Sequence, residues 1–178
     1  MLNRRILLTG ASALTALVAT SGCTAKPKPE VKAIFQNIYD EMVSQSPMLA
    51  TTLGLDKDKL AGLKSKLDPS TPEERARILA FYEKSLAALK TIDRNDLTGM
   101  DRINYDAVLW DISLTTEGYK TYKFGDGGTY WGPYPISQLT GAYQYVPDFL
   151  DSQHSIETKA DAEAFLSRLG EYAVVLDQ

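Results

Sequence analysis

Apolar residues recur at helical spacing along almost the whole chain from residue 31 onward, and this pattern limits the fold more than any other feature. Val31, Ile34 and Ile38 share one face of a first helix, because residues three and four apart lie on the same side of a helix. Ser46-Pro47 ends that helix, since the residue before a proline disfavours helical backbone. The pattern predicts an all-α protein.

Two short helical stretches and one long helix are expected next. The short ones lie at residues 48–55 and 58–67. The long helix has the clearest start, with Thr71 as N-cap, Pro72 at the first helical position and Glu74 placed to complete a capping box. Its apolar stripe consists of Ile78, Tyr82, Leu86 and Leu89.

A fourth helix is predicted from about Thr98 and a last one from about Thr158. The fourth has two apolar stripes, so we expect it to be covered on two sides; they are Met100, Ile103, Ala107, Trp110 and Leu114, and Tyr105, Leu109 and Ile112. The last helix carries the stripe Ala162, Leu166, Leu169, Ala173 and Leu176. It stops on an uncapped apolar turn, which predicts a truncated part of a larger helical fold. The expected architecture is an irregular array of about five helices.

Residues 122–149 interrupt the helical pattern with glycines, prolines and aromatic side chains. We expect a long loop here before the last helix, with one short helix around residues 136–140. Rigid aromatic side chains on a constrained backbone suit a cleft wall or a partner surface, although the same rings could instead cover the core. The residues selected as this candidate surface are Tyr130, Trp131, Tyr134, Gln138 and Tyr143.

The first 23 residues are typical of a bacterial export signal. Arg4 and Arg5 precede an apolar stretch, residues 6–19, that is too short to remain as a transmembrane helix. The arginine pair resembles the twin-arginine export motif, and an ordinary Sec signal is the open alternative. Thr20-Ser21-Gly22-Cys23 resembles a lipobox and predicts lipidation of Cys23, with a buried structural cysteine as the alternative. Residues 24–30 form a tether, and residues 31–178 form the helical region. The expected location is the bacterial cell envelope, on the periplasmic face or the outer membrane.

The residue inventory argues against a catalytic or metal centre in this chain. There is one cysteine and one histidine, which cannot supply a zinc site alone. Asp151-Ser152-Gln153-His154 lies too close in sequence for a triad and is interpreted as a polar surface loop. Gly125-Asp126-Gly127-Gly128 lacks the lysine of a phosphate loop. A net charge of −4 without a basic cluster excludes a typical nucleic-acid binder. We therefore expect no cofactor here.

Several stretches resemble one family, the bacterial domain of unknown function 885. The clearest are Leu97-Thr98-Gly99-Met100-Asp101-Arg102-Ile103-Asn104-Tyr105-Asp106 and Tyr134-Pro135-Ile136-Ser137-Gln138-Leu139-Thr140-Gly141. The segment 161–178 resembles the family helix with Asp-Ala-Glu and Arg-Leu and a closing Leu-Asp-Gln. Ser46-Pro47, Ala50-Thr51 and Leu53-Gly54 resemble an early family motif. Together these matches follow the family order along nearly all of the helical region.

This resemblance implies a longer parent protein. Family members resemble helical zinc metallopeptidases, with a His-Glu-x-x-Pro-Gly-His-His motif near the C-terminus that has no counterpart here. The implied function is the N-terminal part of an envelope-anchored, zinc-dependent peptidase-like hydrolase. The missing C-terminal part, a peptide substrate and the membrane are its implied partners, and zinc is implied only in the parent. The alternative is a small non-enzymatic envelope lipoprotein that binds a partner through the aromatic loop.

Overall fold

The computed structural model describes residues 30–122, 136–138 and 140–177, and all the regular secondary structure in this part of the chain is helical. It contains six α-helices and two 3₁₀-helices, where about five helices were expected. In chain order they are α1 (Val31–Gln45), α2 (Pro47–Thr52), η1 (Asp58–Ser65), α3 (Pro72–Leu89), η2 (Arg94–Asp96), α4 (Gly99–Thr121), α5 (Ala142–Ser152) and α6 (Lys159–Leu176). The all-α prediction is confirmed. Within these residues, no helix combines the length and apolar character needed to span a membrane.

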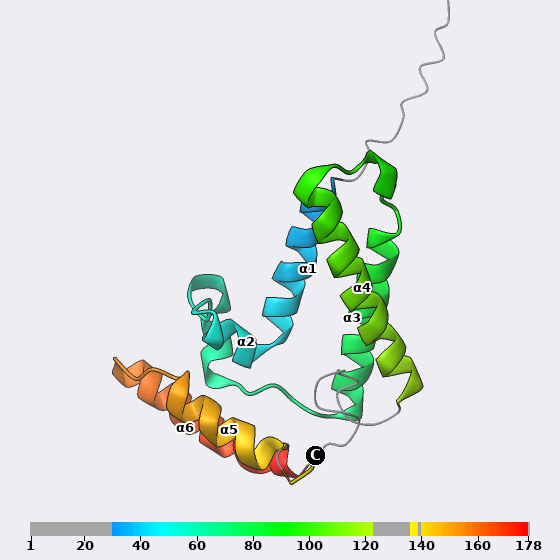
Figure 1. Cartoon of the computed structure of the whole chain (residues 1–178). Coiled ribbons are helices and arrows are strands. Elements are labelled where there is room, and N and C mark those ends of the chain that lie inside the picture. The colour runs from blue at the N-terminus through cyan, green and yellow to red at the C-terminus, as the bar shows by residue number, and fades with distance from the viewer. Residues whose placement is uncertain (1–29, 123–135, 139, 178) are drawn as a thin grey trace, which may run out of the picture.

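The helices form two packed groups, which Figure 1 shows on opposite sides of α2. In the first group, α1, α3 and α4 contact one another around a core of Val31, Ile34, Leu89, Tyr105 and Ile112. In the second group, α5 lies beside α6 around a core of Leu67, Val146, Phe149, Leu150 and Val175. Because α2 contacts both α1 and η1, and η1 contacts α6, these two short elements connect the groups.

Side-chain caps begin α2 and α3, and the cap of α3 is the one predicted from the sequence. The hydroxyl oxygen of Ser46 accepts from the amide of Leu49 at 3.1 Å, so one serine ends α1 and caps α2. Thr71 accepts from the amide of Glu74 at 3.1 Å and caps α3. The Glu74 carboxylate accepts from Arg77 rather than from the Thr71 amide, so the second half of the predicted capping box is replaced by an ion pair.

The segment predicted as one long loop before the last helix contains α5, and this expectation was wrong in its described part. Residues 136–138 and 140 are not helical; the Ser137 amide instead donates to the Thr140 carbonyl at 2.8 Å in a turn. Helix α5 begins after Gly141 and includes Pro147, which cannot donate to the Tyr143 carbonyl four residues earlier. The Tyr172 hydroxyl of α6 donates to that carbonyl at 3.4 Å. A contact from another helix thus offsets the missing hydrogen bond.

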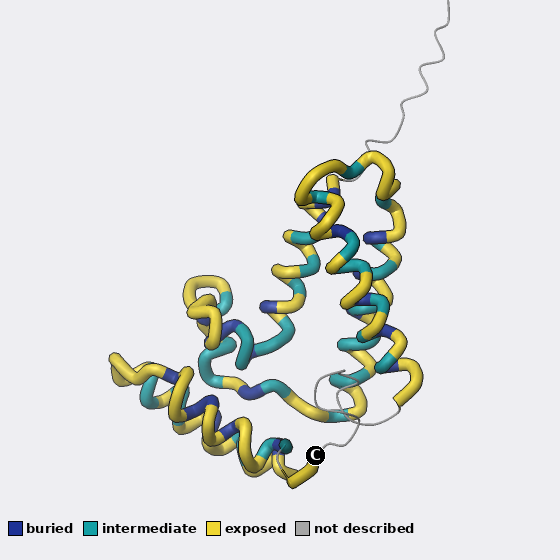
Figure 2. Tube along the Cα trace, in the orientation of Figure 1, coloured by how far each residue is buried: buried dark blue, intermediate teal, exposed yellow. Residues whose placement is uncertain are grey.

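Helix α4 is covered on one side only in the described structure, which contradicts the expected cover on two sides. Tyr105 and Ile112 are buried in the first core. The other stripe faces outward, with Trp110 67% and Ile103 59% exposed. Figure 2 shows this exposed face running along α4. The apolar spacing was read correctly, but no described helix packs against it.

Helix α6 also packs with a different face from the one that its leucine spacing indicated. Leu166 is 65% exposed, and Leu169 and Leu176 are exposed as well. The side that contacts α5 and η1 carries a second series at three- and four-residue spacing, namely Phe165, Arg168, Tyr172 and Val175. Because Arg168 stands in the middle of that series, the sequence pattern alone favoured the opposite face.

Truncation of a side chain in the core beneath α4 and truncation on the exposed side of α4 should affect stability very differently. Leu89 of α3 has no solvent exposure and packs in the core that α4 covers, so Leu89→Ala should lower the free energy of unfolding by about 2–5 kcal/mol. Trp110→Ala should change it by no more than about 0.5 kcal/mol, because the ring already faces solvent. Urea unfolding followed by circular dichroism measures both. Equal losses for the two variants would contradict the exposed position of the α4 stripe.

Candidate functional site

The residues selected from the sequence as a cleft or partner surface are only partly described. Tyr130, Trp131 and Tyr134 lie outside the described residues, as do Cys23, Arg4 and Arg5. Gln138 is exposed, and Tyr143 at the start of α5 is 44% exposed. The Tyr143 hydroxyl donates to the Gln138 carbonyl at 2.8 Å. The structure therefore brings these two residues together at the surface, and neither lines the pocket described next.

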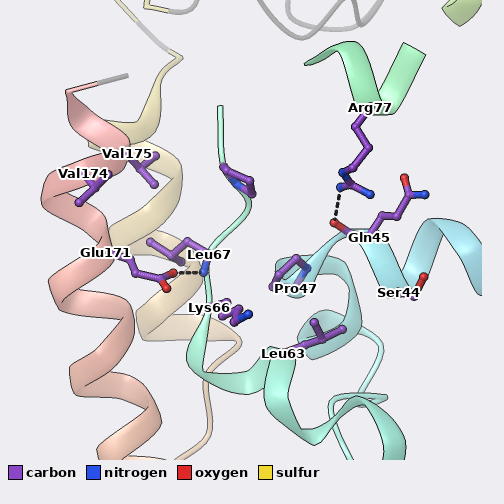
Figure 3. A pocket seen from close by; sticks show the side chains of 11 residues that line it. Ser44, Gln45, Pro47, Leu63, Lys66, Leu67, Arg77, Glu171, Val174 and Val175 are labelled. Carbon is purple, nitrogen blue, oxygen red and sulfur yellow. Dashed lines mark hydrogen bonds between the residues drawn. The ribbon is translucent and has the colours of Figure 1, made fainter. Parts of the chain in front are cut away.

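A pocket of about 460 Å³ lies between α6 and the segment that follows η1, and Figure 3 shows its lining side chains. Its apolar wall includes Pro47, Leu67 and Val175. Charged side chains from three separate elements complete the lining; they are Lys66, Arg77 and Glu171. The pocket thus lies where the two helical groups meet.

Two of these charged side chains are already bound to neighbouring parts of the chain. The Glu171 carboxylate accepts from the Leu67 amide at 2.6 Å. The guanidinium of Arg77 donates to the Gln45 carbonyl at 3.2 Å and to the Glu74 carboxylate, and the hydrogen bond to Glu74 raises the pKa of Arg77. Neither group is hydrogen-bonded to a nucleophile, so the arrangement lacks the nucleophile–base pair of covalent catalysis. Their contacts instead join α6, the segment after η1, α1 and α3.

Arg168, on the buried side of α6, lies directly behind the pocket wall. Its side chain has no solvent exposure. Its Nε donates to the Lys66 carbonyl at 2.8 Å, and its Nη2 donates to the Leu63 carbonyl at 3.2 Å and to the Thr51 hydroxyl at 2.6 Å. The guanidinium also lies 4.9 Å from the centre of the Phe149 ring. One side chain of α6 therefore holds the backbone of residues 63 and 66, which line the pocket.

The remaining nitrogen of this guanidinium donates to the chain's one histidine. Arg168 Nη1 lies 2.7 Å from His154 Nδ1, and because arginine has no acceptor, the imidazole must accept there. The other ring nitrogen, Nε2, lies 3.0 Å from the Asp161 carbonyl and therefore donates. These two partners require a neutral imidazole. Burial lowers the pKa of His154, and the positive charges of Arg168 and Lys64 lower it further.

Carboxylates lie on the far side of the guanidinium and balance its charge. Asp56 is buried and accepts from the Thr51 hydroxyl at 2.9 Å. Asp68 accepts from the Met48 amide at 2.9 Å and from Ser46 at 2.5 Å, yet burial raises the pKa of Asp68 above its usual range. Burial lowers the pKa of Arg168, and the charges of Asp56, Asp68 and Glu171 oppose that effect. The whole cluster is a satisfied polar network inside the protein.

The described residues do not fit a zinc site. They contain no group of three or more histidine, cysteine, aspartate or glutamate side chains placed to hold a metal ion. Both ring nitrogens of His154 are already committed, one to Arg168 and one to the Asp161 carbonyl. A zinc ligand needs a free imidazole lone pair, so we assign no metal chemistry to these residues.

Comparison with known proteins identifies the family. A family model described as a bacterial protein of unknown function (DUF885) matches residues 47–178. The chain belongs to this family. The match begins at the first residue of α2 and includes Arg168, its hydrogen-bond partners and every pocket residue except Ser44 and Gln45. It confirms the family resemblance seen in the sequence motifs. No curated protein and no solved structure matches the chain.

The Arg168 cluster was missed by the sequence analysis, and the interpretation of His154 was wrong. Asp151, Ser152 and Gln153 are exposed as expected of a polar surface loop, but His154 is only 5% exposed. Its burial depends on Arg168, fourteen positions later on another helix. One sequence feature could have indicated that Arg168 is buried, because Arg168 lies at helical spacing between apolar residues of this DUF885 protein.

Replacement of Arg168 should be costly even when its charge is kept. Arg168→Lys has three donors on a flexible stem and cannot reach all four acceptors. Each buried acceptor left unsatisfied costs about 1–3 kcal/mol, so we expect at least that loss in the free energy of unfolding. Arg102→Lys, at an exposed position of α4, is the matched control. Chemical denaturation compares the two variants, and an equally small effect at both positions would contradict a structural role for Arg168.

Proposed function

We propose that this chain is the exported, lipid-anchored N-terminal helical region of an envelope hydrolase that resembles zinc metallopeptidases. In this role the chain contributes a structural wall, and the catalytic and metal-binding residues belong to further sequence of the same protein. The aromatic segment, including Tyr130, Trp131, Tyr134, Gln138 and Tyr143, forms part of the wall that faces a peptide substrate.

The observation that carries this proposal is the pair of exposed apolar stripes on α4 and α6. On α4 the exposed members are Met100, Ile103, Trp110 and Leu114, and on α6 they are Leu166, Leu169 and Leu176. Single exposed apolar residues are ordinary, but contiguous apolar faces mark surfaces that another structure covers. Both helices also bury their opposite face. A helix that is apolar on both sides is typical of the interior of a larger protein.

The internal network supports a structural role for the described residues. Every buried side-chain nitrogen and oxygen in the described residues has a hydrogen-bond partner. The most strongly buried charged groups, Arg168 and Asp56, are bound to the chain itself rather than turned into the pocket. Groups that are fully satisfied in this way rigidify a scaffold. A wall that positions a neighbouring catalytic centre needs such rigidity.

The size of the native protein tests the proposal directly. We expect an antibody raised against residues 30–178 to detect, in cell-envelope fractions, a band several times larger than the 19.7 kDa of this chain. A band at or just below that mass would overturn the proposal and leave a small envelope lipoprotein. In that case the aromatic segment would be the first place to look for partner binding.

Lipid anchoring is tested separately at Cys23. Cys23→Ser should abolish incorporation of radiolabelled fatty acid and move the protein from the detergent phase to the aqueous phase, because the attached acyl chains supply the membrane affinity. Ser21→Ala keeps a small residue in the lipobox and should change neither result. Labelling that persists in Cys23→Ser would contradict lipidation at this residue.

A further inference from the structure

The polar part of the contact between α6 and η1 includes Arg168, a side chain that is also hydrogen-bonded to one titratable ring. Arg168 and Glu171 of α6 bind the backbone of residues 63, 66 and 67, and Lys64 of η1 forms an ion pair with Asp161. Of the Arg168 contacts, only the one to His154 is with a group that can change charge near neutral pH.

We propose that this contact is an acid-sensitive latch. Protonation of His154 breaks its hydrogen bond with Arg168 and repels the guanidinium, which then loses its position on the Leu63 and Lys66 carbonyls and releases the α5–α6 pair from η1. The inference goes beyond the proposed function and does not depend on it, since it uses only the described residues of the present chain.

The geometry gives the reason. Nδ1 of His154 accepts from the guanidinium at 2.7 Å, so a proton added at Nδ1 would point at another donor. Nε2 already carries its proton toward the Asp161 carbonyl at 3.0 Å. The protonated ring therefore cannot keep both of its partners. On the side of Phe165, whose ring centre lies 5.4 Å away in an edge contact, the imidazole is covered and cannot reach solvent. The ring must move out of the cluster to become charged.

The charged groups around the ring oppose its protonation overall. From α6 it faces the Arg168 cation and the Asp161 carboxylate, and from η1 it faces the Lys64 cation. Asp161 is held by Lys64 and by Thr158, which keep the pKa of that carboxyl well below its usual range. The more distant Asp56, Asp68 and Glu171 act on Arg168 and keep it charged. Burial and two nearby cations thus outweigh the hydrogen bond to the Asp161 carbonyl and the Asp161 charge, and they lower the pKa of His154.

The direction of the pH dependence follows from that lowered pKa. An unfolded histidine titrates at about 6.5, and the folded ring titrates below that value. The open form is the one in which His154 has left the cluster, and the closed form is the one in the structure. Below about pH 6.5 the open form therefore binds more protons than the closed form, and the latch weakens as the pH falls. The Asp161 carboxylate loses its contribution to the closed form only below its ordinary pKa of 3.8. The raised pKa of Asp68 acts in the opposite direction, because acidification favours its buried neutral form, so it cannot imitate the histidine effect.

The titration of the ring is the first test, and the 178-residue chain suits it because His154 is its one histidine. Nitrogen-15 NMR of the histidine-labelled protein should show an Nε2-protonated neutral ring at pH 7.5 and a midpoint below 6.5. A midpoint at or above 6.5, or a ring protonated at Nδ1 at neutral pH, would overturn the proposal. This measurement needs no variant and stands even where a substitution prevents folding.

Hydrogen exchange tests the release itself. Between pH 7.5 and 5.5, after correction for intrinsic exchange, the opening constant of amides in residues 63–68 should rise by up to about tenfold in total, mostly below pH 6.5, because one proton is linked to opening. Amides of α3 serve as the internal control. His154→Gln keeps an acceptor for Arg168 but does not titrate, and it should remove this rise. The proposal fails when the wild-type protein shows no rise, or when the variant shows the same one.

Discussion

The guanidinium of Arg168 joins α6 to η1, to α2 and to His154 at the start of the α5–α6 connection, while having no contact with solvent. Burying a charge is strongly unfavourable unless hydrogen bonds and opposite charges replace the lost water. Here four acceptors, the face of Phe149 and the carboxylates beyond Thr51 replace it. Because arginine presents five donors in a rigid plane, it fixes the directions of several backbone carbonyls at once. The position of η1, and with it the wall of the pocket, follows from this one side chain.

Most of the helices could be predicted from the sequence because their signals are local. Ser46 before Pro47 and Thr71 before Pro72 act through hydrogen bonds to amides three residues away, and such bonds form wherever the backbone turns into a helix. Helix α5 was not predictable in the same way. Its interior proline argues against a helix, and the carbonyl that Pro147 leaves free finds its donor in Tyr172, on the next helix. A signal that depends on a residue 29 positions away has no trace in a local pattern.

The same limit applies to the candidate site. Helical spacing shows that α4 and α6 each have apolar faces, but it cannot say which face meets a neighbour, and in α6 the packed face is the one that contains an arginine. Residue type alone places Arg168 and His154 at the surface. Their burial is possible only because each satisfies the other, and because the carbonyls of residues 63 and 66 accept from Arg168 and the carbonyl of Asp161 accepts from His154. Long-range pairing of this kind becomes visible only in the folded chain.

The exposed stripe and the buried cluster give α6 two different faces, and together they suggest how the helix would behave in a longer protein. On the Arg168 face, the proposed latch makes the polar attachment of α6 to η1 sensitive to the charge of His154. On the Leu166 face its attachment is apolar, and burial of aliphatic side chains is insensitive to pH in this range. If both proposals hold, acid would weaken the first attachment and leave the second intact. The α5–α6 pair would then stay with the covering structure and separate from η1, which makes the 63–68 segment the point where the two parts move apart.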